Sequence, residues 1–453
     1  MNNKNLVVEA EPLPLVPDSA GMPSAPNCAE RDICDYSGAE QAGAAGTHSR
    51  AHLVIDHPPR LAPDSLPIEF GHGRSVSQPR IMMLGLRGVP NVQGGVEMHV
   101  EMLGQELAHA GWNVEIIGRR PYLTKSKPYH WRKMKIIPLW APRMMMFEAV
   151  THTFIGVLYA AIRRPDILHL HAVGPGLMSP LARMLGLKVV TTHHGYDYNR
   201  EKWGPLAKWI LRYGEKLAVR TSNAVIAVSK DVAETMKRRH NRNLIHIPNG
   251  VAIRPGLASP EVLAEFDLER HQYIVMVARI VPEKRQSDLI AAFARLAKHD
   301  WKLVIIGDAD HHSGYLNEVE TLAKRTPGVV MTGFQSGDRL ASLFSQARLF
   351  VLPSLHEGMP ISLLEALSYG IPVLASDIPA NHEVSLPPDD YFPAGDVEAL
   401  VKALEQKLSK PLSEWEAQAR ILKATQYAWS SVAGATIDVY RTLLTPDRGK
   451  KLP

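Results

Sequence analysis

From residue 80 to about residue 375, short apolar runs alternate with longer segments in which apolar residues recur every three or four positions. The short runs predict buried strands, and the longer segments predict amphipathic helices. Strands that alternate with helices imply right-handed βαβ crossovers and a parallel sheet. The predicted strands form two series, first Arg80–Leu84, Asn113–Gly118, Lys135–Leu139, Asp166–Leu170, Lys188–Thr192 and Ala224–Val228, and then Tyr273–Ala278, Trp301–Ile306, Val329–Thr332, Leu349–Leu352 and Val373–Ala375.

The two series predict an α/β protein with two Rossmann-like, doubly wound domains, residues 80–255 and 256–428. Pro248-Asn249-Gly250 ends the first half as a turn that could act as a hinge. After Asp396 the pattern predicts helices only. Ligands of such sheets bind at the carboxyl ends of the strands, so the loops that follow the strands are the candidates for function.

The loop after Leu349–Leu352 begins a candidate site, L-H-E-G-M-P-I-S-L-L-E-A-L-S-Y-G, residues 355–370. It predicts a tight turn and a helix, with Glu357 on the turn and Glu365 in the helix. The N–H groups at the helix start suit a diphosphate. Eight helical residues put the two carboxylates at most ~12 Å apart, about the span of a sugar nucleotide. From spacing alone, two solvated glutamates on a surface helix are the alternative.

The longer run P-S-L-H-E-G-M-P-I-S-L-L-E-A-L-S-Y-G-I-P-V-L-A-S-D-I resembles the donor-site motif of the retaining family-4 glycosyltransferases. The resemblance extends from about Arg80 to about Leu444 and implies the GT-B fold, in which two Rossmann-like domains face each other across a cleft. It also implies that the helix at residues 429–446 crosses back onto the first domain. By the same resemblance Glu357, with the amides of Gly358 and Met359, contacts the transferred sugar, and Glu365 holds the ribose.

A second candidate site follows the first strand of the second series, in V-A-R-I-V-P-E-K-R. Arg279 and Lys284 lie five positions apart there, and two cations would neutralise a diphosphate as it leaves. The motif resemblance favours this role over solvated surface charge, which remains the interpretation of Arg285.

The loop after Arg80–Leu84 is rich in glycine and includes Gly94 and Gly95. It is not G-x-G-x-x-G, so it is a weak candidate for dinucleotide binding. It resembles the Gly-Gly loop at the interdomain cleft of the same family, which implies a backbone-lined site for an anion or acceptor.

His193 and His194 follow the predicted strand Lys188–Thr192. Paired histidines suggest a metal, but the sequence offers no third and fourth ligand at a suitable spacing. Similar pairs recur at His169/His171 and His311/His312. The resemblance assigns His194 to the cleft, where it would position the donor sugar or the acceptor; the alternative is a structural histidine.

Asp308-Ala309-Asp310 has the form of the D-x-D metal motif of the other large glycosyltransferase fold, GT-A. It occurs here in a chain with two Rossmann-like halves, so we interpret it as a polar loop and expect no metal cofactor.

Composition narrows the class of protein. The 453 residues carry a net charge of +5, and residues 1–79, with ten prolines and no sustained period, predict a disordered tail. That tail holds five Lys/Arg and ten Asp/Glu, so the remainder carries +10, which suits anionic ligands. The two cysteines, Cys28 and Cys34, both lie in the tail, and no run of about 18 apolar residues or signal peptide is evident. We expect a cytoplasmic protein with no nucleic-acid partner.

Residues 119–135, R-R-P-Y-L-T-K-S-K-P-Y-H-W-R-K-M-K, carry seven Lys/Arg and no acid. Tyr122, Tyr129 and Trp131 are interleaved, which suits anionic lipid headgroups. Residues 144–147, three methionines and a phenylalanine, could add a shallow apolar contact. The hypothesis is peripheral binding to the inner face of the cell membrane, and a solvated loop with an edge strand is the alternative.

Together these features predict a retaining, metal-independent glycosyltransferase of bacterial polysaccharide synthesis. It would move a hexose or deoxyhexose from a nucleotide-sugar to a saccharide or lipid-linked saccharide. The segments G-L-R-G-V-P-x3-G-G-V-E and H-G-Y-D-Y-N-R-E-K-W-G resemble bacterial rhamnosyltransferase-like enzymes of surface-polysaccharide assembly most. A non-catalytic sensor or scaffold that binds a sugar nucleotide is the alternative. A glycoside hydrolase is a weaker one, because its carboxyls flank the sugar from opposite faces.

Overall fold

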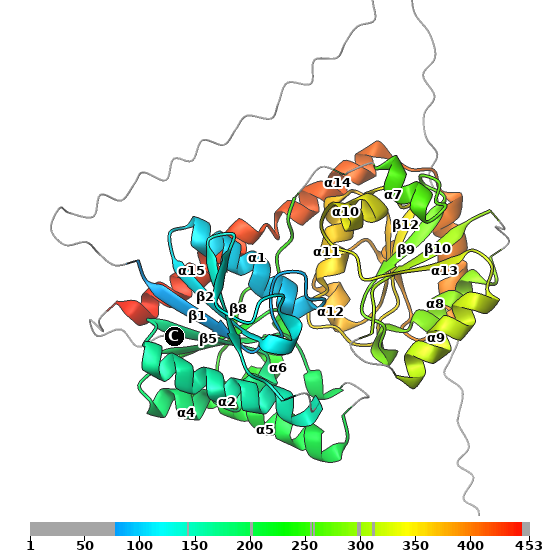
Figure 1. Cartoon of the computed structure of the whole chain (residues 1–453). Coiled ribbons are helices and arrows are strands. Elements are labelled where there is room, and N and C mark those ends of the chain that lie inside the picture. Colours follow the sequence, from blue (N-terminus) through cyan, green and yellow to red (C-terminus); the bar gives the residue numbers. More distant parts are fainter. Residues whose placement is uncertain are drawn as a thin grey trace, which may run out of the picture. The chain divides into compact units, whose positions relative to one another are not determined.

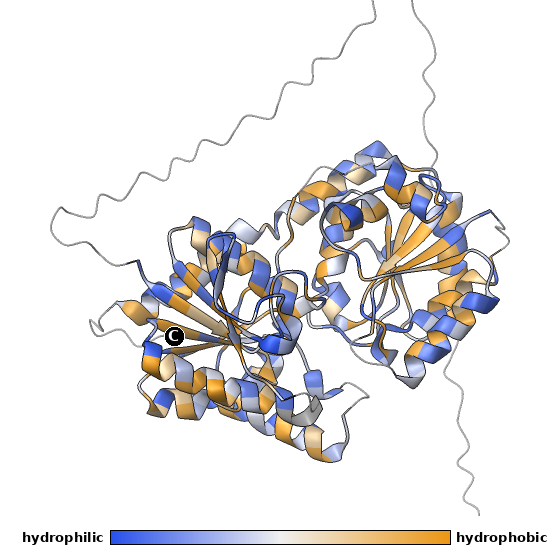
Figure 2. Ribbon diagram, viewed as in Figure 1, coloured by the Kyte–Doolittle hydropathy of each residue, from blue (hydrophilic) through white to orange (hydrophobic). Residues whose placement is uncertain are grey.

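The computed structural model describes residues 78–142, 145–199, 203–253, 256, 259–296, 300–309 and 313–445, without the side chains of residues 145–147. The predicted tail up to residue 77, Asp310 with His311 and His312, and the side chains of residues 144–147 are therefore outside the described residues. The described strands form two sheets, and most of their ribbon has the hydrophobic colour in Figure 2.

The first sheet has eight strands in the order β3-β4-β2-β1-β5-β6-β7-β8. Figure 1 labels β1, β2, β5 and β8 of this sheet. All pairs in it are parallel except β3 with β4. Its strands are β1 (Arg80–Leu84), β2 (Asn113–Arg119), β3 (Tyr129–Trp131), β4 (Met134–Leu139), β5 (Ile167–His171), β6 (Val189–His193), β7 (Ala224–Ala227) and β8 (Ile245–His246).

Helices cover both faces of this sheet. In β1, Ile81 and Met83 join a core cluster with α1 (Gly95–His109) and α15 (Trp429–Leu444), while Met82 and Leu84 join a second cluster. That second cluster includes residues of α2 (Met145–Arg163) and α4 (Ser179–Met184). Successive side chains of a strand point to opposite faces, so the two clusters lie on opposite sides of the sheet. The remaining helices here are α3 (Val173–Gly176), α5 (Pro205–Thr221) and α6 (Lys230–His240), with the short turns η1 (Arg120–Tyr122) and η2 (Asp197–Asn199).

The second sheet has six parallel strands in the order β11-β10-β9-β12-β13-β14. Its strands are β9 (Tyr273–Val277), β10 (Lys302–Ile306), β11 (Val329–Gly333), β12 (Leu349–Leu352), β13 (Val373–Ser376) and β14 (Tyr391–Phe392). Its helices are α7 (Pro260–Glu265), α8 (Gln286–Phe293), α9 (Gly314–Arg325), α10 (Gly337–Ser345), α11 (Ile361–Ser368), α12 (Pro379–His382), α13 (Val397–Ser409) and α14 (Glu414–Thr425), with η3 (Pro282–Lys284) and η4 (Pro388–Asp390). Alternate residues of β9 again enter two separate core clusters.

In both sheets the order of the strands reverses beside the first strand of its series, β1 or β9. Open α/β sheets bind ligands at such switch points, outside the carboxyl ends of the strands. None of the described helices is both long and apolar enough to cross a bilayer.

Candidate functional site

A cavity of about 930 Å³ opens at the carboxyl ends of strands from both sheets. The wall from the second sheet includes residues after β9, β10 and β12, and the wall from the first includes residues after β1, β5 and β6. All nine residues singled out in the sequence line this one cavity, namely Gly94, Gly95, His194, Arg279, Lys284, Glu357, Gly358, Met359 and Glu365.

The turn between β12 and α11 carries Glu357, and α11 itself carries Glu365. β12 is fully buried, and Pro360 caps α11 in an extended conformation, so residues 353–360 bend between two fixed elements. Lys284, at the end of η3, donates to Glu357 Oε1 in an ion pair whose two side chains are almost buried. Glu365 lies on α11, in the wall of the same cavity. Lys284 of η3 and Glu357 of this turn therefore place a cation and a carboxylate side by side.

The two halves of the chain meet backbone to backbone at the base of the cavity. A Cβ atom on Gly358 would lie 2.0 Å from the carbonyl oxygen of His194, and one on Gly195 would lie 2.9 Å from Gly358 Cα. Gly195 also has φ +116°, a conformation that side chains disfavour. Only glycine permits this approach, which brings the β6 loop and the β12 loop together.

Asn249 reinforces this contact. Its Nδ2 donates to the Met359 carbonyl oxygen at 2.7 Å, and its Oδ1 is 2.9 Å from His99 Nδ1. Because the amide nitrogen must face the carbonyl, Oδ1 is the acceptor, and His99 carries its proton on Nδ1. The predicted hinge turn thus holds the loop between β12 and α11 against α1 through the buried side chain of Asn249.

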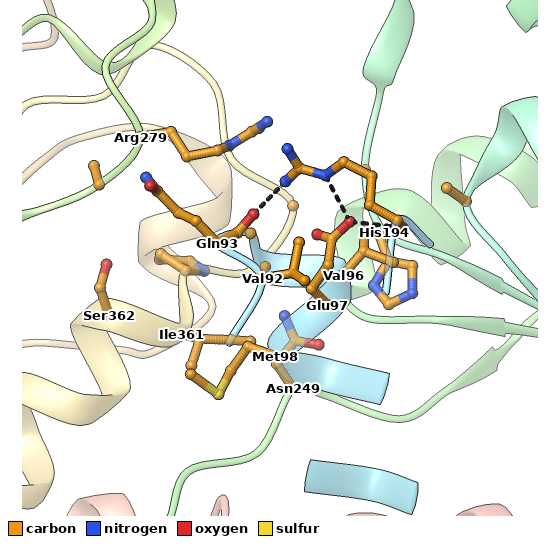
Figure 3. Close-up of a pocket in the computed structure, with 18 of the residues that line it drawn as sticks. Val92, Gln93, Val96, Glu97, Met98, His194, Asn249, Arg279, Ile361 and Ser362 are labelled. Carbon is orange, nitrogen blue, oxygen red and sulfur yellow. Dashed lines mark hydrogen bonds and ion pairs between the residues drawn. The ribbon is translucent and has the colours of Figure 1, made fainter. Parts of the chain in front are cut away.

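The glycine-rich loop is held by an ion pair beneath it. Arg87 Nε lies 3.0 Å from Glu97 Oε1, and a second Arg87 nitrogen donates to the Gln93 carbonyl oxygen (Figure 3). Burial alone would raise the pKa of Glu97, but the Arg87 charge and hydrogen bonds outweigh it and lower the pKa. Gln93 also exchanges hydrogen bonds with the backbone N–H and carbonyl of Asp308, at 3.1 and 3.2 Å. The Arg87–Glu97 ion pair therefore fixes the conformation of the glycine-rich loop, and Gln93 binds this loop to the loop after β10.

Four histidines gather at the base of the first sheet's wall. His171 Nδ1 lies 3.2 Å from His194 Nε2, the rings of His99 and His194 are 4.7 Å apart, and those of His169 and His171 are 4.1 Å apart. His169 also bonds Tyr440 of α15 and Thr192, each at 2.7 Å. Desolvation lowers the pKa of all four, to about 4 for His99 and about 3 for His169. The cluster is neutral at physiological pH.

Three of these, His99, His171 and His194, bring their ligand atoms within 4.8 Å of one another, the one such group of three found among the described residues. The expectation that no third ligand accompanies His194 rested on spacing along the chain, and it was wrong about proximity in space. One nitrogen of each ring already has a hydrogen-bond partner, however, whereas His171 Nε2 is buried with none among the described residues. His99 Nδ1 bonds Asn249, and His171 and His194 bond each other.

His193, the neighbour of His194, has a different surrounding. Its Nε2 lies 3.1 Å from Glu215, and its Nδ1 accepts from the Gly195 N–H. The two neighbouring histidines therefore have different roles. His194 lines the cavity, and His193 stabilises the loop after β6 through its bond to the Gly195 N–H.

The chain matches two protein-family descriptions. Residues 93–254 match "Glycosyltransferase Family 4", and residues 263–426 match "Glycosyl transferases group 1". This chain is a glycosyltransferase of the family-4 and group-1 type.

Two relatives and one solved structure illustrate the likeness. The chain is 28% identical to alpha-maltose-1-phosphate synthase of Mycobacterium tuberculosis over 403 residues, 80% of this chain and 99% of the relative. It is 27% identical to the UDP-Gal:alpha-D-GlcNAc-diphosphoundecaprenol alpha-1,3-galactosyltransferase of Escherichia coli, over 54% of this chain and 68% of that enzyme. Sucrose-phosphate synthase of Thermosynechococcus elongatus superposes with a TM-score of 0.71, 21% identity and coverage of 81% and 99%. The predicted GT-B fold is confirmed.

Several residues of this glycosyltransferase site were not singled out in the sequence. Asn249 and His99 join the two walls, and Arg87 with Glu97 shapes the glycine loop. A set of aromatic side chains also lines the wall of the first sheet, namely Tyr122, Trp131, Tyr196, Trp203, Trp209 and Tyr213. Of these, Tyr122 and Trp131 are predicted from the sequence as membrane contacts. The set comes from η1, β3, the segment after β6 and α5, so no single stretch of sequence marks it.

Asp308 of the D-x-D segment does not line the main cavity among the residues that the structure describes there. Its carboxylate accepts from the N–H of Ala309 at 2.7 Å. Asp310 lies outside the described residues. The geometry of Asp308 fits the interpretation as a polar loop.

Proposed function

We propose that this glycosyltransferase retains the anomeric configuration as it moves a sugar from a nucleotide-sugar donor to a saccharide or lipid-linked saccharide. The observation that carries the proposal is the Lys284–Glu357 ion pair in the wall of a cavity that Arg279, Glu365 and His194 also line. Cations for a diphosphate, a carboxylate for a ribose and a carboxylate for a sugar are thus available to one bound molecule.

In the proposed mechanism the bond between the sugar C1 and the diphosphate oxygen breaks, and the acceptor oxygen bonds to C1 on the same face. The acceptor proton passes to the departing phosphate oxygen. Arg279 and Lys284 offset the charge that grows on the diphosphate, the work that a divalent metal does in other enzymes. Lys284 is already paired with Glu357, so a bound diphosphate shares this cation and releases Glu357 toward the sugar. We therefore propose that no metal cofactor is needed.

Glu365 is proposed to hold the ribose, and Gly358 and Met359 to present their amides to the sugar. The Asn249 bond to the Met359 carbonyl supports this role, because it fixes the orientation of that loop. His194, neutral and beside Gly195, is proposed to bind a hydroxyl of the donor sugar or of the acceptor. Gly94 and Gly95 are proposed to line the entry of the acceptor.

The name of the Escherichia coli relative specifies a UDP-linked donor, a diphosphoundecaprenol-linked acceptor and an alpha linkage. By that likeness we propose a role in bacterial polysaccharide assembly. The two segments described above favour enzymes of the rhamnosyltransferase type. Such acceptors are carried by a membrane, so we also propose that the protein works on the cytoplasmic side and binds that surface peripherally.

The basic segment at residues 119–135 was the predicted membrane contact. Lys125, Lys127, Arg132 and Lys133 are exposed. The aromatic residues interleaved with them are half-buried instead: Trp131 and Tyr122 line the cavity, and Tyr129 packs on the core and donates to the Val89 carbonyl oxygen. The segment therefore offers charge to an anionic surface, but no free aromatic anchor.

The test is to incubate the protein with a panel of nucleotide-sugars and follow each sugar by NMR. A transferase releases sugar slowly to water, or faster to an added acceptor, and the first-formed anomer reports retention. A sensor or scaffold that only binds the donor releases none, and an inverted first product would refute the retaining mechanism.

A further inference from the structure

A second surface of the first sheet's half combines apolar, aromatic and basic side chains. The helices α2, α4 and α5 lie together on one side of the sheet (Figure 1). Much of the ribbon of α2 has the hydrophobic colour (Figure 2), and a helix that is apolar on most sides is normally buried. We call the outer side of these three helices the α2–α4–α5 face.

Apolar side chains on this face are exposed to solvent. On α2, Phe154, Leu158 and Ile162 follow one another at intervals of four residues, so they form a continuous stripe. Ile162 is 81% exposed, and Met184 at the end of α4 is 84% exposed. With Leu206, Trp209 and Tyr213 of α5, seven large exposed side chains lie on three adjoining helices, more than the scattered apolar residues of an ordinary surface.

The outer side of α5 adds aromatic residues. Leu206 and Trp209 are 64% and 63% exposed, and the ring of Trp209 stacks on that of Tyr213 at 5.7 Å with an interplanar angle of 2°. Trp and Tyr prefer the boundary between lipid and water, where one part of the ring is apolar and another is polar.

The charges of the face have one sign. Lys208, Arg212, Lys216 and Arg220 recur every fourth residue of α5, which makes a cationic stripe beside Trp209. None of these four forms an ion pair with a carboxylate among the described residues. The only acids of the three helices, Glu148 and Glu215, are 7% and 2% exposed. The exposed charge is therefore wholly positive.

We propose that the α2–α4–α5 face docks on an anionic lipid bilayer, with the apolar stripe of α2 and Trp209 entering the headgroup region. A protein partner would need an equally apolar and acidic surface, whereas a bilayer with anionic headgroups offers both properties together. This inference names the partner surface of the function proposed above and rests on it.

The same helix connects this face to the site. Trp209 and Tyr213 line the cavity and are also exposed on the face. Docking through α5 places the rim of the cavity at the bilayer, so a saccharide carried on a membrane lipid enters beside these two rings. The cationic stripe of α5 begins beside Trp209 and continues along the helix, where it attracts anionic headgroups.

The test is co-sedimentation with vesicles of phosphatidylcholine alone or with 30% phosphatidylglycerol, about 30% being chosen to give a strongly anionic surface. The wild-type protein is expected to bind only the anionic vesicles and to be released by high salt. The triple variant Lys208→Ser, Lys216→Ser, Arg220→Ser should bind on the order of 100-fold more weakly, because each cation adds about five-fold.

The matched control removes three cations from the other basic surface, Lys125→Ser, Lys127→Ser and Lys133→Ser, and should change binding by no more than a few-fold. Insertion is tested with an acrylodan label in a chain whose Cys28 and Cys34 are serine. The label on Ile162→Cys should shift to the blue with vesicles, and the label on Leu422→Cys of α14, equally apolar and exposed, should not.

A wild-type chain that ignores anionic vesicles, a control triple that weakens binding more than the α5 triple, or equal shifts at positions 162 and 422 would each overturn the inference. A dimer in solution that Ile162→Ser converts to a monomer would assign the face to a second copy instead. Release of sugar from the donor is measured without vesicles, so failure of the proposed transferase function stays separate from failure of docking.

Discussion

At the residue scale, Lys284 and Glu357 depend on each other. Both side chains are nearly buried, and removal of one leaves the other charge without its partner. Arg279 lies in the same wall of the cavity, on the loop after β9. The segment between β9 and α8 thus positions both cations in the cavity wall before a donor binds.

We predict that Arg279→Ala or Lys284→Ala lowers kcat by about 10²–10³-fold, because each removes charge that stabilises the departing diphosphate. The matched control is Arg285→Ala, which removes a neighbouring cation that pairs with Asp288. It should leave the rate within about two-fold. EDTA should change nothing, and activity that vanishes with EDTA and returns with Mn²⁺ would contradict the clamp and favour Asp308 and Asp310.

The histidine cluster predicts a dependence of stability on pH. Burial lowers the pKa of His99 to about 4 and of His169 to about 3 in the folded chain, whereas an unfolded histidine titrates near 6.5. Between these values the unfolded chain binds more protons, so the free energy of unfolding falls as the pH falls below about 6.5.

We expect each of these histidines to remove up to about 1.4 kcal/mol per pH unit in that range. Urea unfolding at pH 7.5, 6.5 and 5.5 measures the loss. His169→Asn should make the dependence shallower, and His130→Gln, on the exposed side of β3, should not change it. A free energy of unfolding that is constant from pH 7.5 to 5.5 would contradict a neutral buried cluster.

Sequence reasoning found His194 but not its surroundings, for a physical reason. His99, His171 and His194 come from α1, β5 and the loop after β6, and only the parallel pairing of β1, β5 and β6 brings them together. Asn249 likewise meets Met359 across 110 residues of chain. A motif records neighbours along the chain, so it captured Glu357, Gly358 and Glu365, and missed contacts made by the fold.

At the scale of elements, the apolar runs predicted eleven strands, and each is present with ends that differ by no more than one residue. The strands that the pattern missed are β3, β8 and β14, which have three, two and two residues. All three are edge strands of their sheets, and only Phe392 of β14 is buried among their residues. Such short edges leave too little periodicity to detect, and β3 is also embedded in a run of charges.

The contact between the β6 loop and the β12 loop gives an element-scale prediction. Gly358→Ala places a methyl group 2.0 Å from the His194 carbonyl oxygen, so the two loops must separate. We expect at least a 100-fold loss of transfer, since a shift of about 1 Å at a reacting centre costs that much. Thermal unfolding and initial rates measure stability and activity separately.

The control for this change is Gly434→Ala in α15, where a new Cβ has no atom within 4 Å. Alanine favours a helix over glycine by about 1 kcal/mol, so this variant should melt at the same temperature or higher and keep its rate. Wild-type activity in Gly358→Ala would show that the two loops need not touch during catalysis.

At the scale of the whole molecule, the last helix joins the end of the chain to its first strands. Trp429, Val432, Ile437 and Tyr440 of α15 share one core cluster with β1 and α1, and Tyr440 bonds His169. The first half is thus completed by residues that follow all of the second sheet along the chain.

Among the described residues the first strand, β1, begins at Arg80, and every other strand of the two sheets follows it. We predict that deletion of Met1–Ser77 leaves folding and donor binding intact. Both chains should melt at the same temperature, and a nucleotide-sugar at 100 times its Kd should stabilise each by about 2.7 kcal/mol.

Deletion of residues 429–453 is the contrasting variant: it removes α15 from the core of the first sheet and should abolish cooperative unfolding of that half. An insoluble product of the first deletion, or a much lower melting temperature, would show that the first 77 residues pack on the folded part. If the two chains melt at the same temperature but the nucleotide-sugar stabilises the shortened chain less, the first 77 residues have a role in binding the donor.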